Sequence, residues 1–251
     1  MNKKLLVFAV STLLAGTAFA AKKAAVITTP VTPAPVPQAV ANNFTGFYAG
    51  VGVLHANMNA EESIAEIYAG TNYTLNNNAG FDQIGEKLFA GYGKSFDRYY
   101  LGLEAIFQYL PDNGGNAIKD GKPYGTDGFS ARNTWALTLR GGYVCNDNWM
   151  PYLLLGTSYT DFKYTSEDLV ATSALGSTAM HNLSKRMWGF TPGIGVQYML
   201  NKNFGFDMRY AYTYYGSTTA NVTSTLSGVS NFTVKFKPTM SVFGLSILYR
   251  F

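Results

Sequence analysis

Hydrophobic and polar residues alternate along eight segments of the chain, and this alternation predicts an all-β protein. Successive side chains of a strand point to opposite faces of a sheet, so a period of two separates the faces. The predicted strands lie near residues 45–54, 85–95, 98–109, 132–144, 149–161, 185–200, 203–215 and 234–251. Because strand edges carry unpaired backbone donors and acceptors, closure of the sheet is expected. The pattern therefore favours an eight-stranded antiparallel barrel.

The connections between these segments alternate between short and long. The turns after the second, fourth and sixth predicted strands are short and polar, and they cover 95–98, 145–148 and 201–203. The other connections are long, and the first of them, 56–84, contains a segment at 60–69 that could form a short surface helix. Short turns on one rim and long loops on the other are typical of a transmembrane β-barrel with periplasmic turns and extracellular loops.

The distribution of large side chains between the two faces indicates a membrane barrel. Along 98–109, one face carries Tyr99, Leu101, Leu103, Ala105, Phe107 and Tyr109. The opposite face carries Tyr100, Gly102, Glu104, Ile106 and Gln108. A continuous face of large apolar groups requires lipid outside, and a narrow barrel is expected to hold only small or polar side chains inside. A lipocalin-like soluble barrel would show the reverse.

Aromatic residues gather at both ends of the predicted strands, where amphipathic rings would meet the two membrane interfaces. The periplasmic girdle is expected to contain Tyr92, Tyr99, Tyr143, Trp149, Tyr198 and Phe251. The outer girdle is expected to contain Tyr109, Trp135, Tyr159, Trp188 and Tyr212.

Four short stretches have the order and spacing found in a known family. They read Gly-Phe-Tyr-Ala-Gly-Val-Gly at 46–52, Leu-Phe-Ala-Gly-Tyr at 88–92, Leu-Gly-Leu-Glu at 101–104 and Tyr-Arg-Phe at 249–251. On these residues the chain resembles the eight-stranded OmpA-type and opacity-protein-like porin family of outer-membrane barrels over 44–251. The resemblance implies a multi-pass β-barrel in the cell outer membrane of a Gram-negative bacterium. Its expected surroundings are outer-membrane lipids, including lipopolysaccharide.

The last predicted strand resembles the assembly signal of bacterial outer-membrane barrels. Its alternate positions place Phe243, Leu245, Ile247, Tyr249 and Phe251 on one face. The resemblance implies that the outer-membrane insertion machinery reads this strand. Periplasmic chaperones are expected partners before insertion.

The first 43 residues are predicted to lie outside the barrel. Residues 1–20 combine a basic start, a short apolar stretch and a small-residue cleavage site, which predicts a secretory signal peptide. Residues 21–43 are rich in proline and are expected to form an extended periplasmic tether, either a spacer or a docking segment. The barrel is then 44–251, and no transmembrane helix is expected in it.

Composition narrows the chemistry that the chain can support. The formal charge of +4 is too small to predict a nucleic-acid surface. Cys145 is the single cysteine, so an intramolecular disulfide and a cysteine-based metal site are excluded. His55 and His181 lack the spacing of a metal-ligand pair. No metal and no cofactor is expected.

Charged residues on the inward face form the candidate site. They are Lys87, Glu104, Arg140, Asp207 and Arg209, with Gln108 and Gln197 nearby. A charge in a narrow interior is costly unless it is paired and hydrogen-bonded, so these residues are predicted to form a salt-bridge network that plugs the lumen. Glu104 and Arg140 lie on adjacent strands and are the expected direct pair. A gated conduit for small solutes is the alternative.

The predicted function is a structural and surface-interaction role, in adhesion or in host or receptor contact, through the extracellular loops. The first loop is acidic and the fourth, 217–231, is uncharged, and both are plausible contact surfaces. A small-solute pore is the alternative. A lipid-modifying barrel enzyme would use His55 or His181 with Ser184 and Glu61 or Glu62 at the outer rim. No spacing marks a nucleophile with its base, so the chain is expected not to be an enzyme.

Overall fold

The computed structural model describes residues 43–68, 71–111, 115–119, 122–146, 148–167, 180–222 and 232–251. The regular structure of these residues is β, in ten strands. They are β1 (Gly46–Tyr68), β2 (Thr71–Phe96), β3 (Tyr99–Tyr109), β4 (Gly115–Lys119), β5 (Lys122–Tyr143), β6 (Trp149–Glu167), β7 (Met180–Met199), β8 (Phe204–Tyr215), β9 (Thr218–Val222) and β10 (Phe232–Arg250). Within the described ranges no helix is long and apolar enough to cross a membrane. The predicted signal peptide and all but Asn43 of the predicted tether lie outside them.

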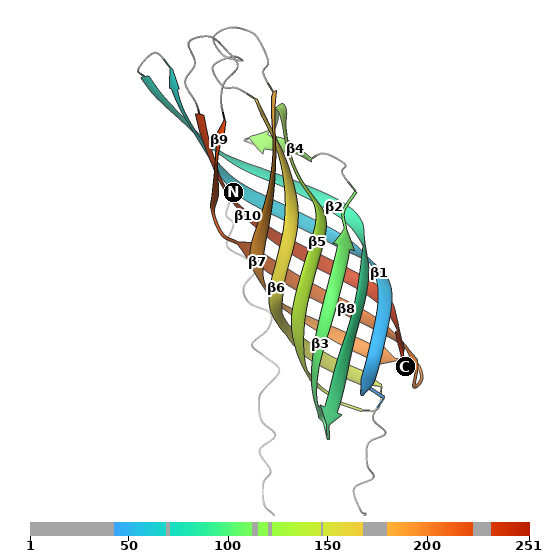
Figure 1. Ribbon diagram of the computed structural model, residues 1–251. Coiled ribbons are helices and arrows are strands. Elements are labelled where there is room, and N and C mark those ends of the chain that lie inside the picture. The colour runs from blue at the N-terminus through green and yellow to red at the C-terminus, as the bar shows by residue number, and fades with distance from the viewer. Residues whose placement is uncertain are drawn as a thin grey trace, which may run out of the picture. The chain divides into compact units, whose positions relative to one another are not determined.

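Eight of the strands close into an antiparallel barrel, as predicted. The hydrogen-bonded order is β1-β2-β3-β5-β6-β7-β8-β10, and β10 returns to pair with β1 from Tyr48↔Arg250 to Ala65↔Thr233. The short strands β4 and β9 add to β5 and β10. Figure 1 shows both of them at the end of the barrel opposite the end of β10. The predicted short turns join β2 to β3, β5 to β6 and β7 to β8.

At the end that carries the long connections, β1, β2, β5, β6 and β7 continue beyond their predicted bounds, whereas β3 and β8 end as predicted. β1 runs to Tyr68 and β2 begins at Thr71, so most of the predicted loop at 56–84 is a paired hairpin. The predicted helix at 60–69 is wrong, because residues 60–68 are strand. Here β1 pairs with β2 on one side and, up to Ala65, with β10 on the other. These pairings satisfy the backbone groups, whereas a short isolated helix is marginal in water.

The outward face in the middle of the barrel is apolar, as predicted. Along β3 the exposed positions alternate with buried ones, and Tyr99 is 68% exposed whereas Glu104 is fully buried. Aromatic rings of neighbouring strands meet at both ends of this apolar belt. Tyr99 and Tyr143 lie 5.8 Å apart between ring centres at the periplasmic end, and Tyr159 and Trp188 lie 4.8 Å apart at the outer end.

The interior differs from the expectation of small or polar side chains only. One apolar cluster fills the periplasmic end and includes Tyr48, Phe89, Tyr100 and Leu248. A second fills the outer end and includes Leu54, Met58, Phe81, Leu110, Phe162, Phe236 and Met240. Large inward groups fit because glycines lie opposite them. A side chain at Gly91 would overlap the Tyr48 ring, with Cβ only 2.7 Å from its hydroxyl.

Candidate functional site

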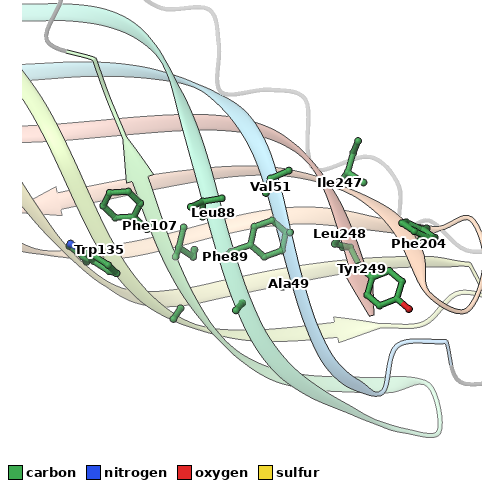
Figure 2. A pocket seen from close by; sticks show the side chains of 14 residues that line it. Ala49, Val51, Leu88, Phe89, Phe107, Trp135, Phe204, Ile247, Leu248 and Tyr249 are labelled. Atoms are coloured by element: carbon green, nitrogen blue, oxygen red, sulfur yellow. The ribbon is translucent and has the colours of Figure 1, made fainter. Parts of the chain in front are cut away.

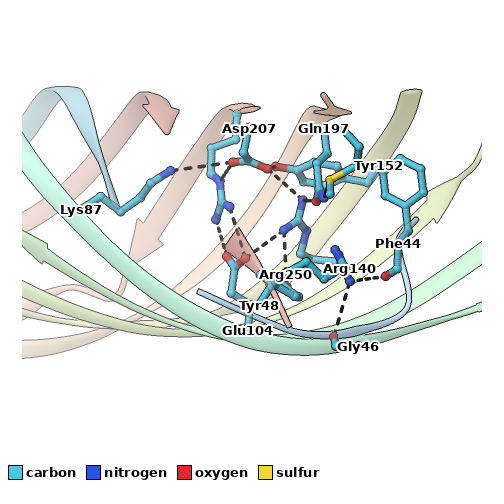
Figure 3. A network of polar contacts seen from close by, with 12 residues as sticks. Phe44, Gly46, Tyr48, Lys87, Glu104, Arg140, Tyr152, Gln197, Asp207 and Arg250 are labelled. Carbon is cyan, nitrogen blue, oxygen red and sulfur yellow. Dashed lines mark hydrogen bonds and ion pairs between the residues drawn. The ribbon is translucent and has the colours of Figure 1, made fainter. Parts of the chain in front are cut away.

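The five charged residues predicted from the sequence lie together in the lumen. Lys87 comes from β2, Glu104 from β3, Arg140 from β5, and Asp207 and Arg209 from β8. Each occupies an inward position of its strand, and each is at most 4% exposed. Figure 3 shows Lys87, Glu104, Arg140 and Asp207 converging from different strands of the barrel. We call the five charged residues the ion-pair layer.

The ion-pair layer is a ring in which each arginine binds both carboxylates. Arg140 donates to Glu104 Oε2 at 2.9 Å and to Asp207 Oδ2 at 2.9 Å. Arg209 donates to Glu104 Oε1 at 2.5 Å and, through Nε, to Asp207 Oδ1 at 2.8 Å. Lys87 Nζ lies 3.9 Å from Asp207 Oδ1. The predicted pair of Glu104 and Arg140 is present, and the β8 residues complete it.

Three uncharged residues join the layer; the sequence had placed Gln197 near it, whereas Tyr48 and Tyr152 were not predicted. Tyr152 donates to Asp207 Oδ2 at 2.7 Å, and its ring lies 3.8 Å from the Arg140 guanidinium carbon. Arg140 also donates to the Tyr48 hydroxyl at 3.4 Å and to Gln197 Oε1 at 3.3 Å. The sequence does contain a pattern that could have predicted the two inward tyrosines. Each pairs across the sheet with a glycine, Tyr48 with Gly91 and Tyr152 with Gly195, which leaves room for an inward ring.

Arg250 adds a further buried cation near the periplasmic end. Its guanidinium donates to the carbonyls of Phe44 and Gly46 and lies 4.9 Å from the centre of the Tyr48 ring. Phe44 is fully buried in the apolar cluster there. The residues of the predicted assembly strand point the other way. Phe243, Leu245, Ile247, Tyr249 and Phe251 are exposed on the outer face of β10 and its end.

A hydroxyl layer separates the ion pairs from the outer apolar cluster. Thr160 shares hydrogen bonds with Thr134 at 2.9 Å and with Tyr215 at 2.7 Å. Ser158, Thr191 and Thr213 form a second chain across β6, β7 and β8, with separations of 2.7 and 3.0 Å. Apolar, ionic, hydroxyl and apolar side chains therefore follow one another along the described interior of the barrel.

Of the rim residues considered for catalysis, His55 and Ser184 each contact a different aspartate. His55 Nε2 lies 3.5 Å from Asp82 Oδ1, whereas Ser184 donates to Asp161 at 3.2 Å. The side chains of His181 and Glu62 lie outside the described residues. Among the side chains that are described, no group of three His, Cys, Asp or Glu residues could hold a metal ion.

The outer wall of the barrel carries a shallow apolar groove of about 560 Å³. Its floor contains Ala49, Ala90 and Ala105, which pair side by side on β1, β2 and β3. Bulkier groups border it, among them Val51, Leu88, Phe107, Trp135, Ile247 and Tyr249 (Figure 2). Such a surface suits contact with lipid chains rather than with water.

A polar pocket of about 660 Å³ lies on the part of β1, β2 and β10 that extends beyond the apolar belt. It is lined by Glu61, Ser63, Asn76, Asn78, Ser217, Lys235 and Lys237. The pairing of these strands places Asn78, Glu61 and Lys237 in one row and Asn76, Ser63 and Lys235 in the next. We call this surface the outer polar face.

A closed antiparallel barrel with an apolar belt between two aromatic girdles defines an integral outer-membrane protein. The chain belongs to the family described as the outer membrane protein β-barrel domain, whose profile matches residues 11–251. The protein is accordingly a multi-pass β-barrel of the outer membrane of a Gram-negative bacterium.

Solved structures of outer-membrane barrels resemble the chain in fold. OprG from Pseudomonas aeruginosa is 18% identical, with a TM-score of 0.51, over 84% of this chain and 100% of OprG. Ail, the attachment invasion locus protein of Yersinia pestis, is 17% identical, with a TM-score of 0.38, over 82% of this chain and 100% of Ail. Among curated proteins none matches the sequence.

Proposed function

We propose that this barrel is a closed, non-catalytic membrane scaffold that presents its extracellular hairpins as a surface for adhesion or receptor contact. The observation that carries the proposal is the change of the outer face along single strands. On β1 the exposed positions Val51 and Val53 give way to Asn57, Asn59 and Glu61. Strands that continue with a polar exterior stand in water above the bilayer, where a partner can reach them.

The side chains inside the barrel support a scaffold over a pore. The ion-pair layer and the two apolar clusters occupy successive levels of the barrel interior, and a steady solute pathway would require all of them to move. The separate pairing of His55 with Asp82 and of Ser184 with Asp161 likewise supports a role without catalysis at the rim.

Shortening the β1–β2 hairpin tests the proposal. Met58 and Phe81 face each other across these strands, so residues 59–80 can be replaced by Asn-Gly, which favours the tight turn that suits a hairpin. We expect cells that carry this variant to lose adherence to cultured host cells and to immobilised glycans, while the barrel keeps its heat-modifiable mobility on gels. Unchanged adherence together with an altered lipid A composition would contradict the proposal and favour a lipid-modifying enzyme.

A milder variant tests the contribution of the outer polar face without removing the hairpin. Lys235 and Lys237 are exposed on the outer polar face, and replacing both by Ser leaves the strand pairing intact. We expect a partial loss of adherence. Lys202→Ser in the turn between β7 and β8 is the matched control, because that lysine lies at the periplasmic end of the barrel.

A further inference from the structure

A small internal cavity of about 20 Å³ lies between the ion-pair layer and the outer apolar cluster. Its lining includes Lys87 and Arg209 of the ion-pair layer, the polar residues Thr138 and Gln108, and apolar residues, among them Ile106, Leu154, Met240 and Val242. Its volume exceeds the roughly 10–15 Å³ that a single water requires. The cavity therefore has room for one guest of atomic size, and a polyatomic oxyanion is too large for it.

The Lys87 side chain is the unsatisfied cationic group among the described residues that line this cavity. An ammonium carries three donors, yet Lys87 Nζ has no hydrogen-bond acceptor although the residue is 1% exposed. Its ion-pair partner, Asp207 Oδ1, is 3.9 Å away and already accepts a hydrogen bond from Arg209. The Phe89 ring, 5.2 Å from the ammonium, offers one weak contact.

The buried charges of the described lumen do not balance. The cations are Lys87, Arg140, Arg209 and Arg250, and the carboxylates are Glu104 and Asp207. Both carboxylates are bound by Arg140 and Arg209, and Arg250 donates to backbone carbonyls at the periplasmic end. Of the two cations that line the cavity, Lys87 is left without a hydrogen-bonded carboxylate. An uncompensated buried charge is costly, so a negative guest beside it would be stabilising.

The cavity walls offer further polar groups to such a guest. The hydroxyl of Thr138 has no hydrogen-bond partner and can donate. The Oε1 atom of Gln108 is also unpartnered, and a half-turn of that amide would present its NH₂ group instead. Gly244 keeps the approach to Lys87 open, because a Cβ there would lie 3.2 Å from Nζ.

We propose that this cavity is a binding site for a small monovalent anion of halide size. The Lys87 ammonium supplies the compensating charge and the Thr138 hydroxyl supplies a second donor. This inference goes beyond the surface role proposed above and does not depend on it.

Chloride is the probe for the stability test. The folded full-length chain in detergent is unfolded with urea in sodium chloride and in sodium gluconate at equal ionic strength, because gluconate is too large for the cavity. If the native state alone binds the anion, chloride at ten times its Kd lowers the unfolding equilibrium constant roughly elevenfold. Lys87→Met is expected to abolish this difference, and Thr138→Val is expected to reduce it. Lys94→Met, on the outward side of the same strand, is the matched control and should keep the full effect.

Bromide gives a direct readout that does not rely on a variant. Crystals of the wild-type protein grown in bromide should show an anomalous peak beside Lys87 Nζ, and that peak should be missing from Lys87→Met. Equal stability in chloride and gluconate, with bromide found on the surface alone, would mean that the cavity holds water only and would overturn the proposal. A chloride effect that persists in Lys87→Met would also overturn it.

Discussion

The membrane-spanning part of the barrel and its extracellular extension are built on the same strands with opposite polarity. At the level of Arg140, the interior is charged and the exterior is Leu139 and its neighbours. At the level of Met58, the interior is apolar and the exterior is Asn57 and Asn59. The pairing of β1 with β2 and with β10 continues without a break from one region to the other.

This inversion shows that strand pairing depends on the backbone of each residue, whereas the match to lipid or water depends on its outward side chain. The backbone ladder satisfies its donors and acceptors in lipid and in water alike, so the strands need not end at the membrane surface. Only the outward side chains must match the surrounding medium, whether it is lipid or water. The extension therefore resembles a soluble barrel, with its core inside, placed on top of a membrane barrel.

Neutralising one carboxylate of the ion-pair layer is expected to have the largest effect on stability. Glu104→Gln leaves Lys87, Arg140 and Arg209 with Asp207 as the one remaining carboxylate of the layer. Leaving buried cations without a partner costs about 3–5 kcal/mol. Urea unfolding in detergent measures the loss. Glu61→Gln on the outer polar face is the control, and it should change the free energy of unfolding by less than about 0.5 kcal/mol.

A double variant shows whether charge balance is the cause. Glu104→Gln with Arg209→Gln restores the difference of one between cations and carboxylates that the layer has in the wild type, so it should be more stable than the single variant. A double variant that loses as much as both single changes together would contradict a coupled network.

Two single substitutions by arginine, one in the apolar belt and one on the extension, test the change in polarity of the outer face. Leu139 faces outward in the apolar belt, between Leu103 and Leu155, and Leu139→Arg should cost about 2–4 kcal/mol, as a cation near the bilayer midplane does. Asn59→Arg on the extension should cost little, because that face meets water. The free energy of unfolding in lipid bilayers measures both. Equal costs at the two positions would place the membrane boundary elsewhere.

The same inversion explains how much of the fold could be predicted from sequence. Alternation with an apolar exterior identified eight strands and their neighbours correctly. The first strand was predicted to end near residue 54, whereas β1 runs to Tyr68. The reason is that Asn57, Asn59 and Glu61 interrupt the apolar outer face from which the strands were predicted. The inward row of Leu54, Ala56 and Met58 continued, but an apolar inner face was not expected in a membrane barrel.

The charged residues of the candidate site could be predicted from the sequence, but the contacts that complete the site could not. The alternation of inward and outward positions was enough to predict which charged residues face the lumen. They are Lys87, Glu104, Arg140, Asp207 and Arg209. The number of partners that each would bind depends on the distance across the barrel, which a single strand pattern does not contain. Tyr48 and Tyr152 were missed because large inward rings become feasible only through glycines on the neighbouring strands.

The outward aromatic at the periplasmic end of β10 gives a smaller predicted effect. Phe251 is 75% exposed and its ring centre lies 5.0 Å from that of Tyr249. If this strand is the proposed assembly signal, Phe251→Lys should lower the amount of protein in the outer-membrane fraction, and Phe251→Tyr should keep it. Normal levels of Phe251→Lys would show that the resemblance to the assembly signal is accidental.

The smallest effect is expected in ion conductance. We propose that the wild-type barrel is nearly silent in a planar bilayer, because ion pairs and apolar clusters fill successive levels of the lumen. Glu104→Gln weakens the ionic level through repulsion among the remaining cations, while the apolar cluster around Met58 and Phe81 stays in place. Openings should therefore be more frequent than in the wild type but brief. If Glu104→Gln is as silent as the wild type although its stability has fallen, the outer apolar cluster alone closes the lumen, and the ion-pair layer serves stability without gating.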